Sequence, residues 1–236
     1  AEGCEVEFGR GKAYPPIEFA LSDGTRCLLS GKIDRLDGTF DEAGTRFFRV
    51  IDYKTGSAEF SYTDLYYGLK LQLPLYLAAV AAADDAAHRA LPAGFYYLPV
   101  KTPVLEEGLS GEALLKEVQK AFRLRGVSLK NAELLEAGGG PSVAPEKGTG
   151  VLDPEDFSAV AEFARRKAAQ TAEAVRTGRA ETAPYRKSKR DTACARCDYA
   201  SVCGFDPTFG GCTYRSVRTV KADAFLEEAR HETVDE

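Results

Sequence analysis

Two charged side chains lie two residues apart at the end of an apolar run, Asp52 and Lys54 in "RFFRVIDYKTG" (46–56). Side chains alternate between the faces of a strand, so these two point to one face about 6.6 Å apart, and Tyr53 points to the other. A carboxylate there can bind a hard cation such as Mg²⁺, and the lysine can polarise a water or hold a phosphate against that cation. An exposed ion pair at a strand end explains these two residues equally well.

A second carboxylate, Asp34, precedes a predicted turn in "GKIDRLDG" (31–38). If the strands that start near Leu28 and Phe47 pair, Asp34 and Asp52 approach each other near one edge of a sheet. Two carboxylates this close need a cation between them or a raised pKa. Together with a lysine they form the arrangement for metal-assisted phosphodiester hydrolysis, in which Mg²⁺ generates a hydroxide nucleophile and neutralises the transition state.

The strands that must position these residues occupy the first part of the chain. Asp23-Gly24 lies between two apolar runs and predicts a hairpin, and a second turn is expected at Asp37-Gly38. The apolar run over 46–54 is then the next strand. We therefore expect three successive antiparallel strands.

Helical periodicity begins after these strands and predicts a mixed α/β chain. A helix is expected from Tyr62 to about Ala87, and Pro74 should kink or divide it. The remaining expected elements are a strand over 94–100, a weaker helix over 111–124, an exposed Gly/Pro-rich loop over 136–150, and a long helix that Asp153 caps, Pro154 opens and Gly178 ends.

Composition limits the class of protein. The chain has 236 residues and is 44% hydrophobic, which is enough for a sizeable core. No apolar run approaches the roughly 18 residues of a membrane span, and the first residues lack a signal-peptide core. We therefore expect a cytoplasmic protein that does not associate with a membrane.

The formal net charge of −5 is unevenly distributed. Residues 221–236 carry two basic and six acidic side chains, whereas residues 179–196 carry six basic and two acidic ones. A basic stretch of this kind contacts phosphates or forms a solvated linker. Its candidate DNA-binding residues are Arg186, Lys187, Lys189 and Arg190.

Three segments together resemble a known family. "GKIDRLDG", "FFRVIDYKTG" and "YYGLKLQLPLYLAAV" (66–80) are similar, in this order, to motif II, motif III and the following Gln-x-x-x-Tyr helix of RecB-type nucleases in the PD-(D/E)XK superfamily. The likeness is greatest to AddB-type nuclease domains, the C-terminal part of the B subunit of bacterial helicase/deoxyribonucleases. It implies a restriction-endonuclease-like α/β fold, with a mixed central sheet flanked by helices, and a C-terminal cysteine-rich segment.

The resemblance also implies an activity and its residues. The activity is that of a Mg²⁺- or Mn²⁺-dependent DNA exonuclease domain, which acts on single-stranded DNA with an AddA-type partner subunit in double-strand-break repair and recombination. Lys54 is then the catalytic lysine, and Gln72 and Tyr76, one helical turn apart, face the site. The implied metal ligands are the carboxylates of Asp34 and Asp52 and the backbone carbonyl of Tyr53.

The C-terminal cysteines give a separate indication. Cys194, Cys197 and Cys203 follow a C-x2-C-x5-C pattern, in which the first two can grip one metal. In a cytosolic protein, metal ligation is favoured over disulfides. AddB-type nucleases end with this spacing, and the resemblance implies a [4Fe-4S] cluster completed by a cysteine far upstream.

Two family features are absent from this sequence. The upstream cysteine would lie before Ala1, so Cys4 or Cys212 could replace it, and zinc or empty thiols stay alternatives to the cluster. The family's metal-binding histidine would also lie before Ala1, since His88 and His231 are both downstream of the motifs. We therefore expect a fragment of a longer polypeptide, whose activity alone is an open question.

The expected organisation has three parts: an N-terminally truncated nuclease core over 1–180, a basic and cysteine-rich segment over 181–215, and an acidic tail over 216–236. Two other interpretations stay open. One is a nuclease-like scaffold that binds DNA or a partner without cutting. The other is a stand-alone single-strand nuclease with an iron–sulfur cluster.

Overall fold

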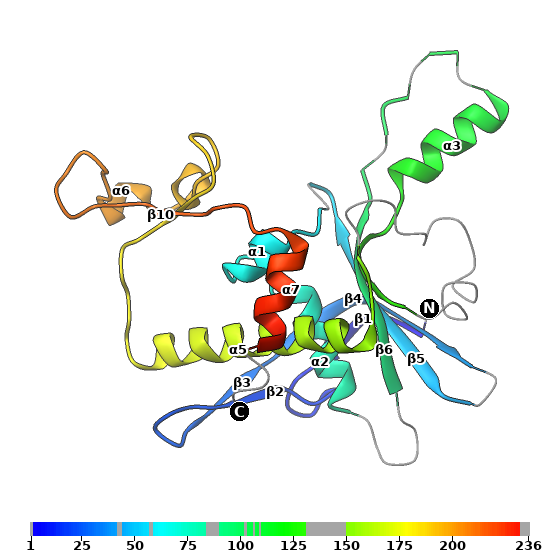
Figure 1. The fold of residues 1–236 in the computed structure, drawn as a ribbon, viewed down its shortest axis with the longest axis horizontal. Coiled ribbons are helices and arrows are strands. Elements are labelled where there is room, and N and C mark those ends of the chain that lie inside the picture. The colour runs from blue at the N-terminus through cyan, green and yellow to red at the C-terminus, as the bar shows by residue number, and fades with distance from the viewer. Residues whose placement is uncertain are drawn as a thin grey trace.

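A mixed β-sheet flanked by helices forms the centre of the molecule, as expected (Figure 1). The computed structural model describes residues 2–41, 44–56, 59–83, 90–101, 103–105, 107–108, 110–130 and 150–231. His88 and, apart from Gly150, the predicted loop over 136–150 lie outside these residues. None of the helices in the described ranges is long and apolar enough to cross a membrane.

The described strands form one large sheet in the order β1-β4-β5-β6-β7-β8 and two small two-stranded sheets. The large sheet consists of β1 (Gly3–Phe8), β4 (Gly31–Phe40), β5 (Arg46–Lys54), β6 (Ala90–Pro99), β7 (Arg125–Leu129) and β8 (Val151–Leu152). The small sheets pair β2 (Ile17–Ala20) with β3 (Arg26–Leu29) and β9 (Tyr185–Arg186) with β10 (Arg215–Ser216). The predicted strand over 94–100 is confirmed within β6, whereas β7 and β8 were not anticipated because they are short and lack an apolar alternation.

The large sheet contains both antiparallel and parallel strand pairs. β4 pairs antiparallel with both β1 and β5, whereas β5 and β6 run parallel. A parallel neighbour needs a crossover connection, and the chain between β5 and β6 supplies it with two helices. Strand β5, which ends with Asp52 and Lys54, lies inside the sheet, with β4 on one side and β6 on the other.

The expected turn at Asp37-Gly38 is wrong, because β4 continues through both residues to Phe40. Asp37 is 7% exposed, and its carboxylate accepts hydrogen bonds from Arg35 Nε at 2.7 Å and Arg49 Nε at 3.2 Å. Arg35, two residues away on β4, and Arg49, opposite on β5, neutralise an acid that would otherwise favour a turn. The chain instead reverses after Asp41.

The predicted helix from Tyr62 divides, but not at Pro74. The helices are α1 (Tyr62–Tyr66), α2 (Gln72–Ala81), α3 (Gly111–Ala121), α5 (Pro154–Arg176), α6 (Ala200–Cys203), α7 (Ala222–His231) and the 3₁₀ turn η2 (Ala193–Arg196). The break follows α1 at Gly68, whose φ of +72° favours glycine. Pro74 is in the first turn of α2, where a missing N–H costs no helical hydrogen bond.

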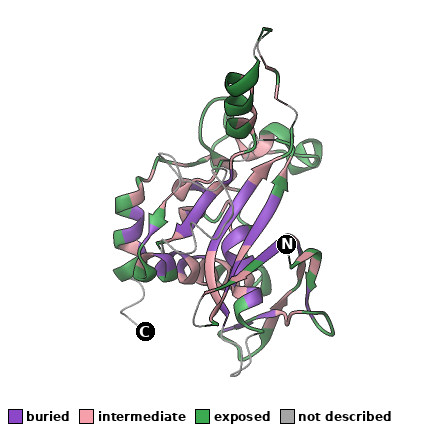
Figure 2. Ribbon diagram, turned by 90° about the vertical axis from the view of Figure 1, so that its right-hand side faces the viewer, coloured by how far each residue is buried: buried purple, intermediate pink, exposed green. Residues whose placement is uncertain are grey.

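The main core lies between one face of the sheet and helices α2, α5 and α7, with buried segments on both layers (Figure 2). The predicted long helix is confirmed as α5, with Pro154 in the first turn and Asp153 at the N-cap position, where its side chain makes no capping hydrogen bond. Phe157, Val160 and Phe163 recur at helical spacing and are buried in this core. The Phe157 ring lies against Phe95 of β6, and the Phe163 ring lies against Phe225 of α7. Burying each such side chain stabilises the fold by about 1.5–3 kcal/mol.

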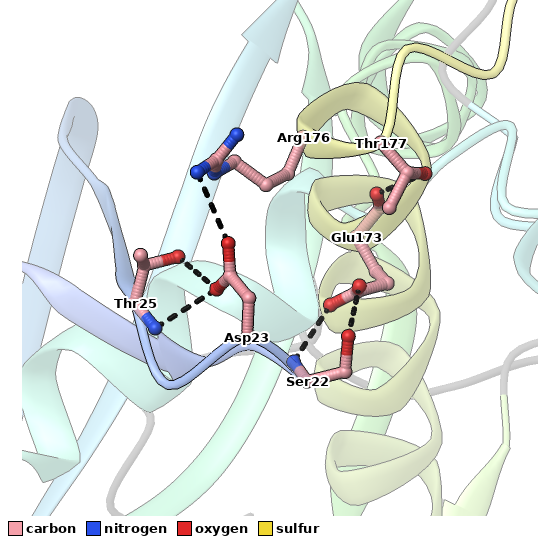
Figure 3. A network of polar contacts seen from close by, with 6 residues as sticks. All are labelled: Ser22, Asp23, Thr25, Glu173, Arg176 and Thr177. Atoms are coloured by element: carbon pink, nitrogen blue, oxygen red, sulfur yellow. Dashed lines mark hydrogen bonds and ion pairs between the residues drawn. The ribbon is translucent and has the colours of Figure 1, made fainter.

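The hairpin predicted at Asp23-Gly24 is confirmed and is held against the end of α5 (Figure 3). The Glu173 carboxylate accepts hydrogen bonds from the backbone N–H of Ser22, at 3.0 Å, and from the Ser22 hydroxyl. Arg176 lies 3.1 Å from Asp23. These contacts fix β2 and β3 beside the core.

The chain after residue 215 is more than an acidic tail. Its helix α7 packs against α5, with Phe225 and Ala229 fully buried. The acidic residues Asp223, Glu227 and Glu228 occupy the same helix. The domain boundaries stay a prediction, but residues 222–231 contribute to the main core.

Candidate active site

Strands β4 and β5 separate at the predicted catalytic residues. Their antiparallel register runs as far as Arg35 opposite Ile51, which sets Asp34 opposite Asp52 at the next position, where the ladder has ended. β5 continues along β6 on its other side. Asp34 Oδ2 accepts a hydrogen bond from the backbone N–H of Tyr53 at 2.9 Å, so its carboxylate reaches across the fork between the strands.

Asp52 and Lys54 form an ion pair that is not the exposed one considered from the sequence. Asp52 is 2% exposed, and Lys54 Nζ lies 2.6 Å from its Oδ2. That oxygen is nevertheless buried without a hydrogen bond of acceptable geometry. Burial raises the pKa of Asp52, the neighbouring Lys54 opposes this, and the Asp34 carboxylate raises the pKa further. A buried, poorly satisfied acid beside a second acid favours a bound cation.

Helix α2 supplies the other side of the site. Lys54 Nζ donates to Gln72 Oε1 at 3.5 Å, and Gln72 Nε2 donates to the Tyr76 hydroxyl at 2.7 Å. Burial raises the pKa of Tyr76, the Gln72 hydrogen bond opposes this, and both aspartates add to the rise. Asp34, Asp52, Lys54, Gln72 and Tyr76 are thus brought together, as the motifs indicated, while their catalytic roles stay predictions.

The donor set fits a hard cation. Mg²⁺ in proteins is bound through one or two carboxylates, with waters and substrate phosphates completing its shell. Because the N–H and C=O of one strand residue point to the same side, the Tyr53 carbonyl faces the fork as its N–H does. No group of three or more His, Cys, Asp or Glu side chains is arranged for a metal within the described ranges. The available oxygens are therefore two carboxylates and one carbonyl, which suits Mg²⁺ or Mn²⁺.

The chain resembles known nucleases over most of its length. A sequence profile of the PD-(D/E)XK nuclease superfamily matches residues 1–204. The chain belongs to this superfamily. The match includes β4, β5 and α2, the elements that carry the PD-(D/E)XK site described above.

Several curated relatives carry one name, which describes the B subunit of an ATP-dependent helicase/deoxyribonuclease. The protein from Alkaliphilus metalliredigens is 32% identical over 248 residues, which cover 98% of this chain and 22% of the relative. Those from Caldanaerobacter subterraneus subsp. tengcongensis and Thermoanaerobacter sp. are 35% and 34% identical, over 92% and 94% of this chain and 20% of each relative. The chain thus spans about a fifth of the length of these relatives, and the resemblance to this nuclease subunit is confirmed.

Tyr97 of β6 belongs to this PD-(D/E)XK site, although no sequence pattern pointed to it. It stands opposite Asp52 in the parallel register and is 3% exposed. Lys54 Nζ lies 5.2 Å from the centroid of its ring. Burial raises the pKa of Tyr97 to about 12, with further contributions from the charges of Asp52 and Asp64 and from Tyr76. Its ring forms an apolar wall beside Lys54.

A second acid–lysine cluster adjoins the first. Asp64 of α1 is 4% exposed, and its two carboxylate oxygens lie 3.4 Å from Lys70 Nζ and 2.6 Å from Lys187 Nζ. Lys70 Nζ also lies 5.8 Å from the centroid of the Tyr97 ring. Sequence reasoning singled out Lys187 but not Asp64 or Lys70, since the contact between α1 and residue 187 joins distant parts of the chain.

The other predicted DNA-binding residues do not join the active site. Arg186 Cζ lies 4.9 Å above the ring of Tyr214. Lys189 and Arg190 are exposed in the loop after β9. Only Lys187 among these four residues contacts the cluster at Asp64. DNA binding by the remaining three stays a prediction.

The cysteines are not assembled into a metal site. All six are free thiols. Cys194 lies in η2, Cys197 follows it, and Cys203 ends α6, but no three thiols gather in the part of the chain that the structure describes. As placed, they do not form the ligand set of a cluster. Cys27 lies on β3 and is half-buried against the core.

Proposed function

We propose that this chain is the nuclease domain of an AddB-type helicase/deoxyribonuclease and hydrolyses phosphodiester bonds of DNA with Mg²⁺ or Mn²⁺. The observation that carries the proposal is the fork between β4 and β5, where Asp34 meets a buried Asp52 whose Oδ2 accepts no hydrogen bond beside Lys54. A second carboxylate does not stabilise an ion pair that is already neutral, whereas two carboxylates together can bind a divalent cation.

Each residue has a distinct task in this reaction. Asp34, Asp52 and the Tyr53 carbonyl hold the cation, which when bound supplies Lewis-acid stabilisation and lowers the pKa of a water. Lys54 places a positive charge beside the cation-binding carboxylate, where it orients the attacking water and offsets charge that develops on the scissile phosphate.

Helix α2 keeps the lysine in position. The Gln72 amide fixes the Lys54 ammonium, and the Tyr76 hydroxyl fixes the Gln72 amide in turn. Such chains restrict the rotamers of a catalytic side chain, which preserves the geometry that the reaction needs. Gln72 and Tyr76 are therefore positioning residues for Lys54.

The substrate and setting follow from the relatives. We place the chain in the cytoplasm, where it processes single-stranded DNA delivered by the helicase motor during double-strand-break repair and recombination, together with an AddA-type partner subunit. The names of the relatives, which combine helicase and deoxyribonuclease, support this assignment. A [4Fe-4S] cluster on Cys194, Cys197 and Cys203 stays a prediction from the resemblance, and iron and sulfide analysis of protein purified without oxygen tests it.

Cleavage of end-labelled single-stranded DNA by the purified chain tests the proposal. We expect cleavage in Mg²⁺, none in EDTA, and a cleavage rate about 10²–10³-fold lower for Asp52→Ala, which should retain DNA binding. Cleavage retained by Asp52→Ala would overturn the assignment of the site. Binding without cleavage by the wild-type chain would favour the scaffold interpretation.

A further inference from the structure

We propose that Lys70 and Lys187 form a second phosphate-binding site, which takes a backbone phosphate of the DNA strand next to the phosphate at Lys54. This inference rests on the proposed nuclease function, because it assumes that a strand crosses the site at β5. It assigns a ligand to a cluster outside the catalytic carboxylates.

A single buried acid arranges the two lysines. Each oxygen of the Asp64 carboxylate contacts one ammonium group, at 3.4 Å for Lys70 and 2.6 Å for Lys187. Two lysines against one carboxylate leave one positive charge uncompensated within this cluster. The Lys70 and Lys187 side chains remain 32% and 29% exposed, so part of each can still reach a ligand. Asp64 therefore holds the two ammonium groups close to each other, while its own negative charge repels an anion bound between them.

The cluster lines a pocket with further donors. Ser61 and Thr219 contribute hydroxyl-bearing side chains to it, together with Lys70 and Lys187. The hydroxyl of Thr63, which also lines the pocket, already donates to the Val220 carbonyl at 3.3 Å. Ser61 Oγ accepts a hydrogen bond from the Asp64 N–H at 3.2 Å, so its own O–H can donate to a phosphate oxygen. A tetrahedral phosphate with several acceptor oxygens matches this mixture of ammonium and hydroxyl donors.

Two acids also line the pocket, and both lie towards solvent. The Glu59 side chain is 74% exposed and lies 3.7 Å from Arg125. Asp191 is exposed, and its backbone carbonyl accepts the N–H of Lys187. Solvent screens exposed acids of this kind more strongly than it screens the half-buried ammonium groups.

The position of the pocket favours DNA as the source of the phosphate. Lys54 and Lys70 lie 5.2 Å and 5.8 Å from the centroid of the same Tyr97 ring. The catalytic lysine and the second site thus flank one buried aromatic side chain. A strand with a phosphate at Lys54 would carry its neighbouring phosphate towards Lys70 and Lys187.

A purely structural role for Asp64 makes a different prediction. Lys187 belongs to the C-terminal segment that lies beside α1 (Figure 1), and Val220 N–H also donates to Thr63 Oγ1 there at 3.0 Å. If the cluster only holds this segment on α1, loss of Asp64 and loss of either lysine weaken the protein alike. If the lysines bind phosphate, loss of Asp64 removes a repulsive charge and acts in the opposite direction.

The test is binding of a fluorescent oligothymidylate in EDTA, measured across a range of salt concentrations. Lys70→Gln and Lys187→Gln should each weaken binding and each lower the slope of log K against log[salt] by about 0.7, the value expected for one single-strand phosphate contact. Lys116→Gln, an exposed lysine on α3, is the matched control and should leave the slope unchanged. Asp64→Asn should bind as tightly as wild type or more tightly.

The outcomes separate the two proposals. Wild-type slopes and affinities in both lysine variants, with normal cleavage in Mg²⁺, would overturn the second phosphate site and leave the nuclease assignment intact. Equal loss of thermal stability and affinity in Asp64→Asn and both lysine variants would show a structural cluster instead. Failure of the wild-type chain to bind or cleave DNA would overturn both proposals.

Discussion

The backbone N–H of Tyr53 donates a hydrogen bond to the Asp34 carboxylate at 2.9 Å, across the point where β4 and β5 separate. This contact holds an acid of one strand beside the peptide unit that follows the acid of the other strand, Asp52. The Tyr53 backbone therefore orients Asp34 through its N–H and presents its carbonyl to the same fork. The two strands together make one oxygen-rich site that neither makes alone.

Removal of either carboxylate should abolish most of the activity. Asp34→Ala and Asp52→Ala should each lower the single-turnover cleavage rate in Mg²⁺ by about 10²–10³-fold, because metal-assisted charge stabilisation contributes several kcal/mol. Glu112→Ala, an exposed acid on α3, is the control and should cleave normally. A full rate in Asp34→Ala would show that Asp34 is not a metal ligand.

Without a bound metal, the charged and buried carboxylate of Asp52 should lower the stability of the folded protein. Its pKa is raised above the ordinary 3.8, so the native state binds the proton more tightly than the unfolded chain does. Stability of the metal-free protein should therefore fall as pH rises from 3.8 through the folded pKa. At neutral pH in EDTA, Asp52→Asn should melt at a higher temperature than wild type, and Mg²⁺ should raise the melting temperature of wild type only. Equal responses to Mg²⁺ would contradict a cation bound by Asp52.

The active-site strands could be predicted from the sequence because their information is local. The apolar run before Asp52 and the turn signal at Asp23-Gly24 each fall within about ten residues, the scale on which strand and hairpin patterns are set. The pairing of β4 with β5 followed from their closeness in the chain. Asp37 misled the same reasoning, since its partners Arg35 and Arg49 make a buried acid acceptable inside a strand.

The surroundings of the site could not be predicted, because they depend on contacts between distant segments. Tyr97 reaches Asp52 through the parallel pairing of β5 with β6, whose register no local pattern specifies. Lys187 contacts Asp64, although more than half the length of the chain separates them in sequence. The core role of Phe225 was missed for another reason, since the acids around it made 216–236 resemble a solvated tail.

The charged carboxylate of Asp37 should stabilise the folded protein, and this stabilisation should be lost at low pH. Burial by itself would raise the pKa of Asp37, but the hydrogen bonds and charges of Arg35 and Arg49 hold it below the ordinary 3.8. The stabilisation is therefore present above 3.8 and lost as pH falls through the folded pKa. The free energies of unfolding of wild type and Asp37→Asn, measured with urea, should differ by a constant amount at higher pH. The two values should converge below pH 3.8. A pH-independent difference would show that the charge of Asp37 is not what stabilises β4 and β5.

The C-terminal helix should prove necessary for the nuclease core. Phe225 is fully buried and its ring lies 4.8 Å from that of Phe163 on α5. Phe225→Ala should lower the free energy of unfolding by about 3–5 kcal/mol, since it removes an aromatic side chain and leaves a cavity. Val175→Ala, 75% exposed on α5, is the control and should change stability by less than about 0.5 kcal/mol. An effect of Phe225→Ala as small as that of the control would mean that α7 does not belong to the core.

Positioning of Lys54 by α2 should be measurable separately from metal binding. Tyr76→Phe removes the hydroxyl that accepts from Gln72, and Gln72→Ala removes the acceptor of Lys54. We expect cleavage rates about 10-fold lower for Tyr76→Phe and up to about 100-fold lower for Gln72→Ala, the range for residues that orient a catalytic group. Because neither side chain is placed as a metal ligand, the Mg²⁺ concentration for half-maximal rate should stay at the wild-type value in both variants. A shift in that concentration with an unchanged maximal rate would assign Gln72 and Tyr76 to cation binding rather than to Lys54.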